Sequence, residues 1–416
     1  MRRVVVTGMG CLSPIGNSVD ETWKSLKEGK CGISTITRYD NTNFKVKYAA
    51  EVKDFDADKY MDPKAARKMA MFSKFAVAAA KMALDDASLT DKADILENTG
   101  IYLGVGIGGL EVTEAAMKSY FASDLKRMPP LTIPELIPNE ATGNISITFG
   151  IHGGSHTIAT ACASGTDAIG DALDQVRAGR YDVVLAGGAE STQCGFANLG
   201  FTVLQALSSK WENEPQKACR PFDKQRDGFI MGEGATILVL EEYEHAKARG
   251  AKIYAEVAGY GASTDGYNLT APNPDGITGS KCMIIAMKDA GVKPEEVQYY
   301  NAHGTSTHLN DAGETQMLHL AFGDAAKKLH ISSTKSMTGH CLGAAAGIET
   351  ALCCKLLEKF DGRLYPNIYD GEYDTNLPKI NIVDINQKYP ECKICMCNSF
   401  GFGGTNAIMI LGKSNE

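Results

Sequence analysis

Short runs of apolar, β-branched residues alternate with longer segments of helical periodicity over most of the chain. This alternation predicts an α/β protein whose sheets are buried between helices. Strands are predicted at residues 3–7, 100–105, 156–161, 183–186, 235–241, 253–260, 297–301, 330–333, 394–398 and 406–411. Helices are predicted at residues 63–85, 164–178, 242–249, 280–290, 311–322 and 343–360.

One boundary divides this pattern near its middle. A charged helix ends at Arg249 and Gly250, and a new strand begins directly after them, as at many helix C-termini. The chain has 416 residues, which is long for one compact domain. We therefore expect two αβ halves, residues 1–250 and residues 251–416.

Composition and charge narrow the class of protein. With 42 Lys and Arg against 50 Asp and Glu, the net charge is −8, which argues against non-specific nucleic-acid binding. The chain shows no run of ~20 apolar residues and no separate apolar segment of a signal peptide near its start. We therefore expect a cytoplasmic protein without a membrane span, whose 12 cysteines are free thiols.

Cys162 lies in a turn between a predicted strand and a predicted helix. Small residues surround it, which leaves room for a sharp turn and a close substrate. The N-terminus of a helix favours a thiolate, so we expect a lowered pKa and a candidate nucleophile. The alternative is a buried structural cysteine, which is the commoner fate of a free thiol.

Two histidines follow predicted strands in turns rich in Gly and Thr. They are His303 in NAHGTST (301–307) and His340 in STKSMTGH (333–340). The ends of strands are where open α/β sheets bind their ligands. Lys335 precedes His340, and Glu349 lies on the helix after it. A lone histidine is more often structural than catalytic, but two histidines in glycine-containing turns favour a catalytic site.

A glycine-rich segment, NSFGFGGTN (398–406), joins the last two predicted strands. Phe400 and Phe402 stand between its glycines, and this arrangement favours a movable gate over a packed core. A plain hairpin loop is the alternative.

Four motifs in order resemble one family. TACASG around Cys162, NAHGTST, STKSMTGH and NSFGFGGTN are similar to those of the β-ketoacyl-acyl-carrier-protein synthases, with the elongating type II enzymes of fatty-acid synthesis nearest. The likeness runs from VVVTGMG near the start to the final strand. It implies a thiolase-like fold, in which two similar halves form a five-layered α-β-α-β-α sandwich, and a homodimer.

The resemblance also implies the chemistry and the role of each residue. Cys162 would accept an acyl group from acyl carrier protein as a thioester, and malonyl carrier protein would then lose CO₂ and attack it. The resemblance implies no metal and no bound cofactor. His303 and His340 would hydrogen-bond the developing enolate, and the N–H groups of Cys162 and Phe400 would form the oxyanion hole. Further positions would have these roles: Lys335 and Glu349 hold the histidine region, Thr270, Thr305 and Thr307 bind the phosphopantetheine arm, Ile107 lines the acyl pocket, and Phe400 acts as the gate.

A basic segment is the candidate docking face for the acidic carrier protein. Lys64, Arg67 and Lys68 follow the helix-start signal Asp62-Pro63 and have the i, i+3, i+4 spacing of one helical face. A solvated basic face is the alternative, and the resemblance favours docking. Gln205 stands where the family often has a basic residue. His308 stands where relatives usually have Pro, and we assign it no role.

Several other interpretations carry less weight. The segment 104–109 formally matches GxGxxG, but without the context of a dinucleotide fold. Cys392 and Cys395 have the CxxC spacing of zinc ligands, yet the alternation through Cys397 indicates one strand face. A thiolase-like or hydrolytic enzyme could use the same cysteine with coenzyme A esters, but the two histidines and STKSMTGH argue against a thiolase, whose second site residue is a further Cys. A non-catalytic chain-length subunit would lack Cys162. A ketosynthase of a polyketide pathway remains the alternative to fatty-acid elongation.

Overall fold

A computed structural model describes the whole chain except residues 123, 125, 368–370, 385 and 415–416. The strands of the described residues are β1 (Val4–Leu12), β2 (Ile33–Thr35), β3 (Tyr48–Ala50), β4 (Gly100–Gly104), β5 (Ser155–Ile158), β6 (Val183–Glu190), β7 (Gly234–Glu242), β8 (Ala255–Thr264), β9 (Tyr299–Asn301), β10 (His330–Ser332), β11 (Asn381–Ile382), β12 (Ile394–Gly401) and β13 (Thr405–Gly412). The α-helices are α1 (Val19–Lys27), α2 (Pro63–Ala66), α3 (Met71–Asp86), α4 (Ala93–Leu96), α5 (Leu110–Ala122), α6 (Thr132–Leu136), α7 (Glu140–Phe149), α8 (Ser164–Arg177), α9 (Gly195–Val203), α10 (Tyr243–Ala248), α11 (Ile277–Ala290), α12 (His308–Phe322), α13 (Lys335–Thr338) and α14 (Ala345–Glu358).

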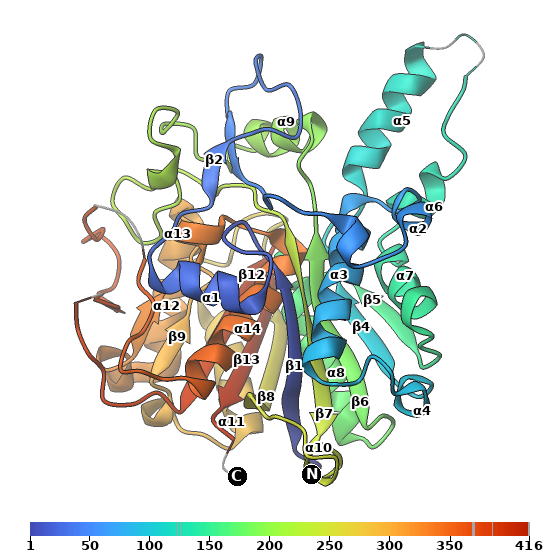
Figure 1. Ribbon diagram of the computed structural model, residues 1–416. Coiled ribbons are helices and arrows are strands. Elements are labelled where there is room, and N and C mark those ends of the chain that lie inside the picture. The colour runs from blue at the N-terminus through green and yellow to red at the C-terminus, as the bar shows by residue number, and fades with distance from the viewer. Residues whose placement is uncertain (123, 125, 368–370, 385, 415–416) are drawn as a thin grey trace.

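The strands repeat one order in the two halves of the chain. From the middle outwards the first half reads β1-β7-β6-β4-β5, and the second half reads β8-β13-β12-β9-β10 with β11 at its edge. In each half four strands run in one direction and one runs against them: β7 is antiparallel to β1, β4, β5 and β6, and β13 is antiparallel to β8, β9, β10 and β12. The halves join where Val5 and Val6 of β1 pair with Glu256 and Ala255 of β8. In Figure 1 strands β4 to β7 of the first half lie on the right, and strands β9, β12 and β13 of the second half lie on the left.

Helices cover both faces of each half. α3 packs on β1 and β7 on the outside of the first half, and α11 packs on β8 and β13 on the outside of the second. Between the halves lie α8, which contacts strands β4, β6, β8 and β13, and α14, which contacts β7 and β12. This arrangement of helix, sheet, helix, sheet and helix is the five-layered α/β fold that the sequence predicted. The division at residue 250 stays a prediction, because the halves share the middle helical layer and a continuous run of paired strands.

Glycine and alanine explain how closely the first outer layer packs. Ala79 and Ala83 of α3 lie against the glycines of β1, and both are fully buried. A Cβ placed at Gly8 or Gly10 of β1 would collide with backbone carbonyl oxygens of α3. The glycines near the start therefore let this helix approach the sheet backbone directly.

The single helix predicted over residues 63–85 is wrong. The chain forms α2, turns at residues 67–70, and starts again as α3 at Met71. Arg67 is the C-terminal cap of α2 and Lys68 lies beyond it, so the basic residues do not share one helical face. Met69 in this turn and Phe72 and Ala76 of α3 are all buried. No described helix is both long and apolar enough to cross a membrane.

Candidate active site

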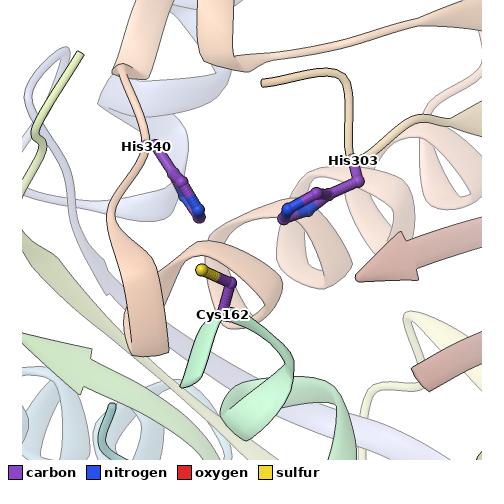
Figure 2. A group of neighbouring side chains, drawn as sticks. All are labelled: Cys162, His303 and His340. Atoms are coloured by element: carbon purple, nitrogen blue, oxygen red, sulfur yellow. The ribbon is translucent and has the colours of Figure 1, made fainter. Parts of the chain in front are cut away.

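Three turns at one edge of the sheets bring Cys162, His303 and His340 together. The ligating atoms of these three side chains all lie within 4.8 Å of one another. Figure 2 shows the thiol of Cys162 pointing up between the two imidazole rings, which enter from separate segments. All three residues line a cavity of about 460 Å³. The sequence therefore identified side chains that the fold does assemble.

Cys162 sits in a tight turn rather than on the first turn of α8. It is the middle residue of the 3₁₀ turn Ala161–Ala163, and Ala161 has a φ of 52°. The Ser164 hydroxyl donates to the carbonyl of Ala161 at 2.6 Å and accepts from the N–H of Thr160 at 2.9 Å. These two bonds stabilise a backbone conformation that L-residues seldom adopt and so hold the thiol in the cavity.

The expected lowering of the Cys162 pKa is wrong for this structure. Burial raises the pKa of the thiol to about 12, although Lys335 and the backbone N–H groups of Phe402 and Cys162 act in the opposite direction. Desolvation outweighs the helix end because only 9% of the residue is exposed. The side chain of Cys162 is therefore a protonated thiol at neutral pH.

The turn after His340 repeats the turn around Cys162 in the other half. The 3₁₀ turn Leu342–Ala344 leads into α14 as Ala161–Ala163 leads into α8, and Leu342 has a φ of 47°. The N–H of Leu342 donates to Nδ1 of His340 at 3.3 Å. Nδ1 is therefore the acceptor in the neutral ring, which places the proton on Nε2. His340 presents an N–H to the cavity.

His303 is held by the carboxylate of Glu314 beneath its turn. Glu314 accepts the N–H of His303 at 2.8 Å and that of Gly304 at 2.7 Å. Burial, the charge of Lys335 and the neighbouring His340 hold the pKa of His303 well below its ordinary value. Burial and Lys335 do the same to the pKa of His340. Both rings are therefore neutral at pH 7.

Two ring nitrogens at this site have no hydrogen-bond partner among the described residues. They are Nδ1 of His303 and Nε2 of His340, and both are buried. An unsatisfied buried polar atom costs free energy, so such atoms often mark where a substrate binds. The site therefore offers polar contacts for a bound substrate.

Lys335 and Glu349 form an ion pair behind the histidines. Their side chains are 0% and 3% exposed, and Nζ lies 2.5 Å from Oε1. Lys335 lowers the pKa of both histidines, whereas burial raises that of Glu349. Lys335 thus places a positive charge near both imidazole rings, and the buried carboxylate of Glu349 is its counterion.

A thiol and two imidazoles also have the composition of a metal site. It is the one cluster of three such groups that the described part of the chain contains. The proton on Nε2 of His340, however, makes this atom a donor, while metal binding needs a free lone pair. The geometry therefore fits a hydrogen-bonding role better than metal ligation. Cys392, Cys395 and Cys397 instead belong to the buried core, where Cys397 contacts Cys353 at 3.2 Å.

The remaining predicted residues fall into two groups. Those lining the cavity are Ile107, Thr270, Thr305, Thr307 and Phe400, together with Gln205 and His308. Lys64, Arg67 and Lys68 do not line it, and all three are exposed. Phe400 is 8% exposed and its ring lies 5.8 Å from that of His303, so it belongs to the cavity wall.

Sequence reasoning missed the two buried carboxylates nearest the site turns. Glu314 lies on a predicted helix shortly after NAHGTST, and Glu190 ends the GGAE segment. Glu190 follows two glycines and an alanine, whereas Glu314 stands among other polar residues, so neither carboxylate was distinctive in the sequence. Only the structure shows that both carboxylates accept backbone N–H groups of loops at the site.

Comparison with known proteins agrees with this geometry. A family model described as "Beta-ketoacyl synthase, N-terminal domain" matches residues 1–246, and its C-terminal counterpart matches residues 254–367. The chain belongs to the β-ketoacyl synthase family. A curated relative, 3-oxoacyl-[acyl-carrier-protein] synthase 2 of Vibrio cholerae, is 45% identical over 98% of both chains.

Solved β-ketoacyl synthases share the fold over their whole length. The ishigamide ketosynthase/chain length factor has a TM-score of 0.91 and 36% identity, with 100% of both chains covered. The AntDE:AntF complex, a type II PKS acyl-carrier protein with its ketosynthase bound to the hexaketide, has a TM-score of 0.87, 33% identity and the same coverage. The family, the fold class, the acyltransferase class and the synthase activity expected from the sequence are confirmed.

Proposed function

We propose that the chain is an elongating 3-oxoacyl-[acyl-carrier-protein] synthase of type 2, an acyltransferase that lengthens fatty acyl chains by two carbons. The observation that carries this proposal is the convergence of one thiol and two neutral imidazoles at the wall of a single cavity. The 45% identity to the synthase of Vibrio cholerae supports it.

The first step is transfer of the acyl group to Cys162. The thiol attacks the thioester carbonyl of the acyl carrier protein, the new S–C bond forms, and the bond to the carrier sulfur breaks. The thiol proton ends on the departing carrier thiol. Backbone N–H groups around the turn, those of Cys162 and Phe400, are the proposed donors to the oxyanion.

The second step is decarboxylative condensation. Malonyl carrier protein loses CO₂, and its electron pair forms an enolate that attacks the acyl carbonyl on Cys162. The sulfur of Cys162 leaves and takes up a proton from water, so that a β-ketoacyl carrier protein departs. His340, with its proton on Nε2, and His303 are the proposed donors to the thioester oxygen where enolate charge develops.

The cavity supports a path for the substrate arm. The hydroxyls of Thr305 and Thr307 lie 3.0 Å apart, and Thr270, in an exposed segment, lines the same cavity. We assign these three residues to the phosphopantetheine arm. Ile107 is assigned to the acyl pocket and Phe400 to the gate.

A ketosynthase of a polyketide pathway is the second candidate. The likeness to the ishigamide and AntDE ketosynthases supports it, because both chains are covered completely. The higher identity to the curated fatty-acyl type synthase favours the first candidate.

Product analysis tests the function. The purified protein is mixed with malonyl carrier protein and a ladder of saturated acyl carrier proteins, and the products are read by mass spectrometry. The proposal requires β-ketoacyl products two carbons longer than each accepted primer, with one CO₂ released for each. Products formed only from β-ketoacyl primers, with none from saturated ones, would instead support the polyketide candidate.

The docking of the carrier protein is assigned to Lys64, Arg67 and Lys68. All three are exposed, and the described structure records no ion pair for them. Their positive charge would attract an acidic partner, even though the chain as a whole carries −8.

Reversing all three charges to Glu is expected to raise KM for carrier-protein substrates about tenfold at low salt, with a smaller effect at high salt. Steady-state kinetics with acyl-pantetheine substrates provide the internal control, since these lack the acidic protein. A matched variant reverses Lys281 and Lys288, which are exposed on α11 in the other half. An equal change of KM in both variants, or no change in either, would contradict the assignment of this docking face.

We also assign a homodimer, working in the cytoplasm. β5 is an edge strand with no neighbour on its outer side among the described residues, and an open edge favours pairing with another chain. α5 projects from the body near this edge (Figure 1), and several large apolar side chains are exposed on this side of the chain: Met117, Phe121, Leu131, Ile133 and Ile147. Light scattering should give about twice the chain mass of 44.5 kDa.

A further inference from the structure

The glycine-rich segment after β4 surrounds a buried carboxylate of the protein itself. Glu190, the last residue of β6, is 0% exposed. It accepts the N–H groups of Gly106 at 2.8 Å, Ile107 at 3.2 Å and Gly108 at 3.0 Å. Three successive N–H groups around one anion form the kind of nest that other glycine-rich loops offer to phosphates. The GxGxxG spacing thus does bind an anion, but an internal one.

A fourth bond connects this nest to the turn beyond His340. The N–H of Gly343 donates to Oε2 of Glu190 at 3.2 Å. Glu190 therefore ties two loops together: one carries Ile107 and follows β4, and the other leads from His340 into α14. The two loops come from different halves of the chain.

Glycine is required on both sides of the carboxylate. A Cβ built on Gly106 would lie 2.7 Å from Oε2 of Glu190, and one built on Gly343 would lie 2.9 Å from it. Real Cβ atoms are essentially never that close to another heavy atom. The backbone thus closes tightly around this side chain, and its position is fixed from both loops.

The second half contains the same device. Glu314 accepts the N–H groups of His303 and Gly304, in the loop after β9, as Glu190 does in the loop after β4. β4 and β9 hold the same place in the repeated strand order. Burial raises the pKa of each carboxyl to about 7, and the backbone N–H groups oppose that rise. Each half therefore uses a costly buried carboxylate to hold one loop of the site.

The loop held by Glu190 forms part of the cavity wall. Gly106 and Ile107 both line the cavity beside Cys162, and Ile107 is 37% exposed. Resting on the proposed function, we propose that Glu190 is a positioning residue for acyl-chain selection: it fixes Ile107 against the turn at Gly343 and so sets which chain lengths fit. Glu190 itself is not among the residues that line the cavity.

The variant Glu190→Gln tests this. It keeps the size of the side chain but replaces one acceptor oxygen with a donor, so at least one N–H group of the nest loses its partner. The ratio of kcat/KM between the longest and the shortest accepted acyl carrier proteins is expected to change about tenfold. Decarboxylation of malonyl carrier protein, which needs no acyl chain, should stay within about twofold of wild type. A proportional fall in both activities would reduce Glu190 to a purely structural role and overturn the proposal.

Two further variants separate specificity from folding. Glu51→Gln is the matched control, because Glu51 is also buried and accepts the N–H groups of Thr37 and Arg38, away from the cavity. It should leave the length profile unchanged. If Glu190 acts through Ile107, Ile107→Ala and Ile107→Ala with Glu190→Gln should have the same profile. Additive effects of the two substitutions would contradict the proposal.

A measurement on the unaltered protein covers the case in which Glu190→Gln does not fold. Hydrogen exchange followed by mass spectrometry should show slow exchange at residues 106–108, because their N–H groups donate to the buried carboxylate of Glu190. Fast exchange there would overturn the proposal. Absence of condensation by the wild-type protein would instead overturn the proposed function, so the two failures are distinguishable.

Discussion

Cys162→Ala is expected to lower condensation at least ~10³-fold while leaving decarboxylation of malonyl carrier protein measurable. The substitution removes the only atom to which the acyl group can be attached, and no described thiol outside this turn lines the cavity. The two imidazoles remain, and they are the groups proposed to stabilise the enolate. Condensation and CO₂ release are measured on the same sample, so the two steps separate directly.

Mass spectrometry of the acylated wild-type protein locates the intermediate independently. Acyl carrier protein should add one acyl mass to the peptide that contains Cys162 and none to the other cysteine peptides. Cys11→Ala is the matched control, because Cys11 is 1% exposed and lies in β1 away from the cavity. Full condensation by Cys162→Ala, or acylation at another cysteine, would remove Cys162 as the nucleophile.

Much of the fold follows from local pattern. All ten predicted strands are present, because strands that are buried on both faces of a sheet consist of continuous apolar, β-branched runs that are easily recognised in a sequence. The helices that escaped prediction, such as α5 and α9, expose apolar side chains such as Phe121 and Phe196, so they lack the one-sided pattern of a surface helix. The break before Met71 was missed for another reason: the turn at residues 67–70 contains neither Gly nor Pro.

Some features of the site were likewise predictable from local sequence, and others were not. Cys162, His303 and His340 were recognisable because each stands in a distinctive turn, and turn chemistry is local. The pKa of Cys162 was mistaken because a helix end is visible in a sequence, whereas burial depends on segments far away, such as Phe400 and Leu342. The carboxylates Glu190 and Glu314 accept hydrogen bonds from backbone N–H groups, which all residues except proline have. No spacing of residue types in the sequence therefore predicts these contacts.

The second large effect is expected at Lys335. Lys335→Ala leaves Glu349 buried without its partner, and breaking such a pair typically costs about 3–5 kcal/mol of unfolding free energy. The same substitution removes the positive charge that lowers the pKa of His303 and His340. Both pKa values should therefore rise, and the acid limb of the pH profile of kcat/KM should move toward neutral pH, since a protonated ring is no longer the neutral donor.

The double variant Lys335→Ala with Glu349→Gln separates these two effects. It leaves no unpaired buried charge, so most of the unfolding free energy should return. The lysine charge is still absent, so the acid limb should stay displaced. Lys355→Ala is the control, because Lys355 is also buried, pairs with Asp20 and Glu358, and lies away from the cavity. It should lower stability, measured by urea unfolding, without moving the pH profile. Recovery of both stability and pH profile in the double variant would make Lys335 only the counterion of Glu349, and the neutrality of the histidines would then rest on burial alone.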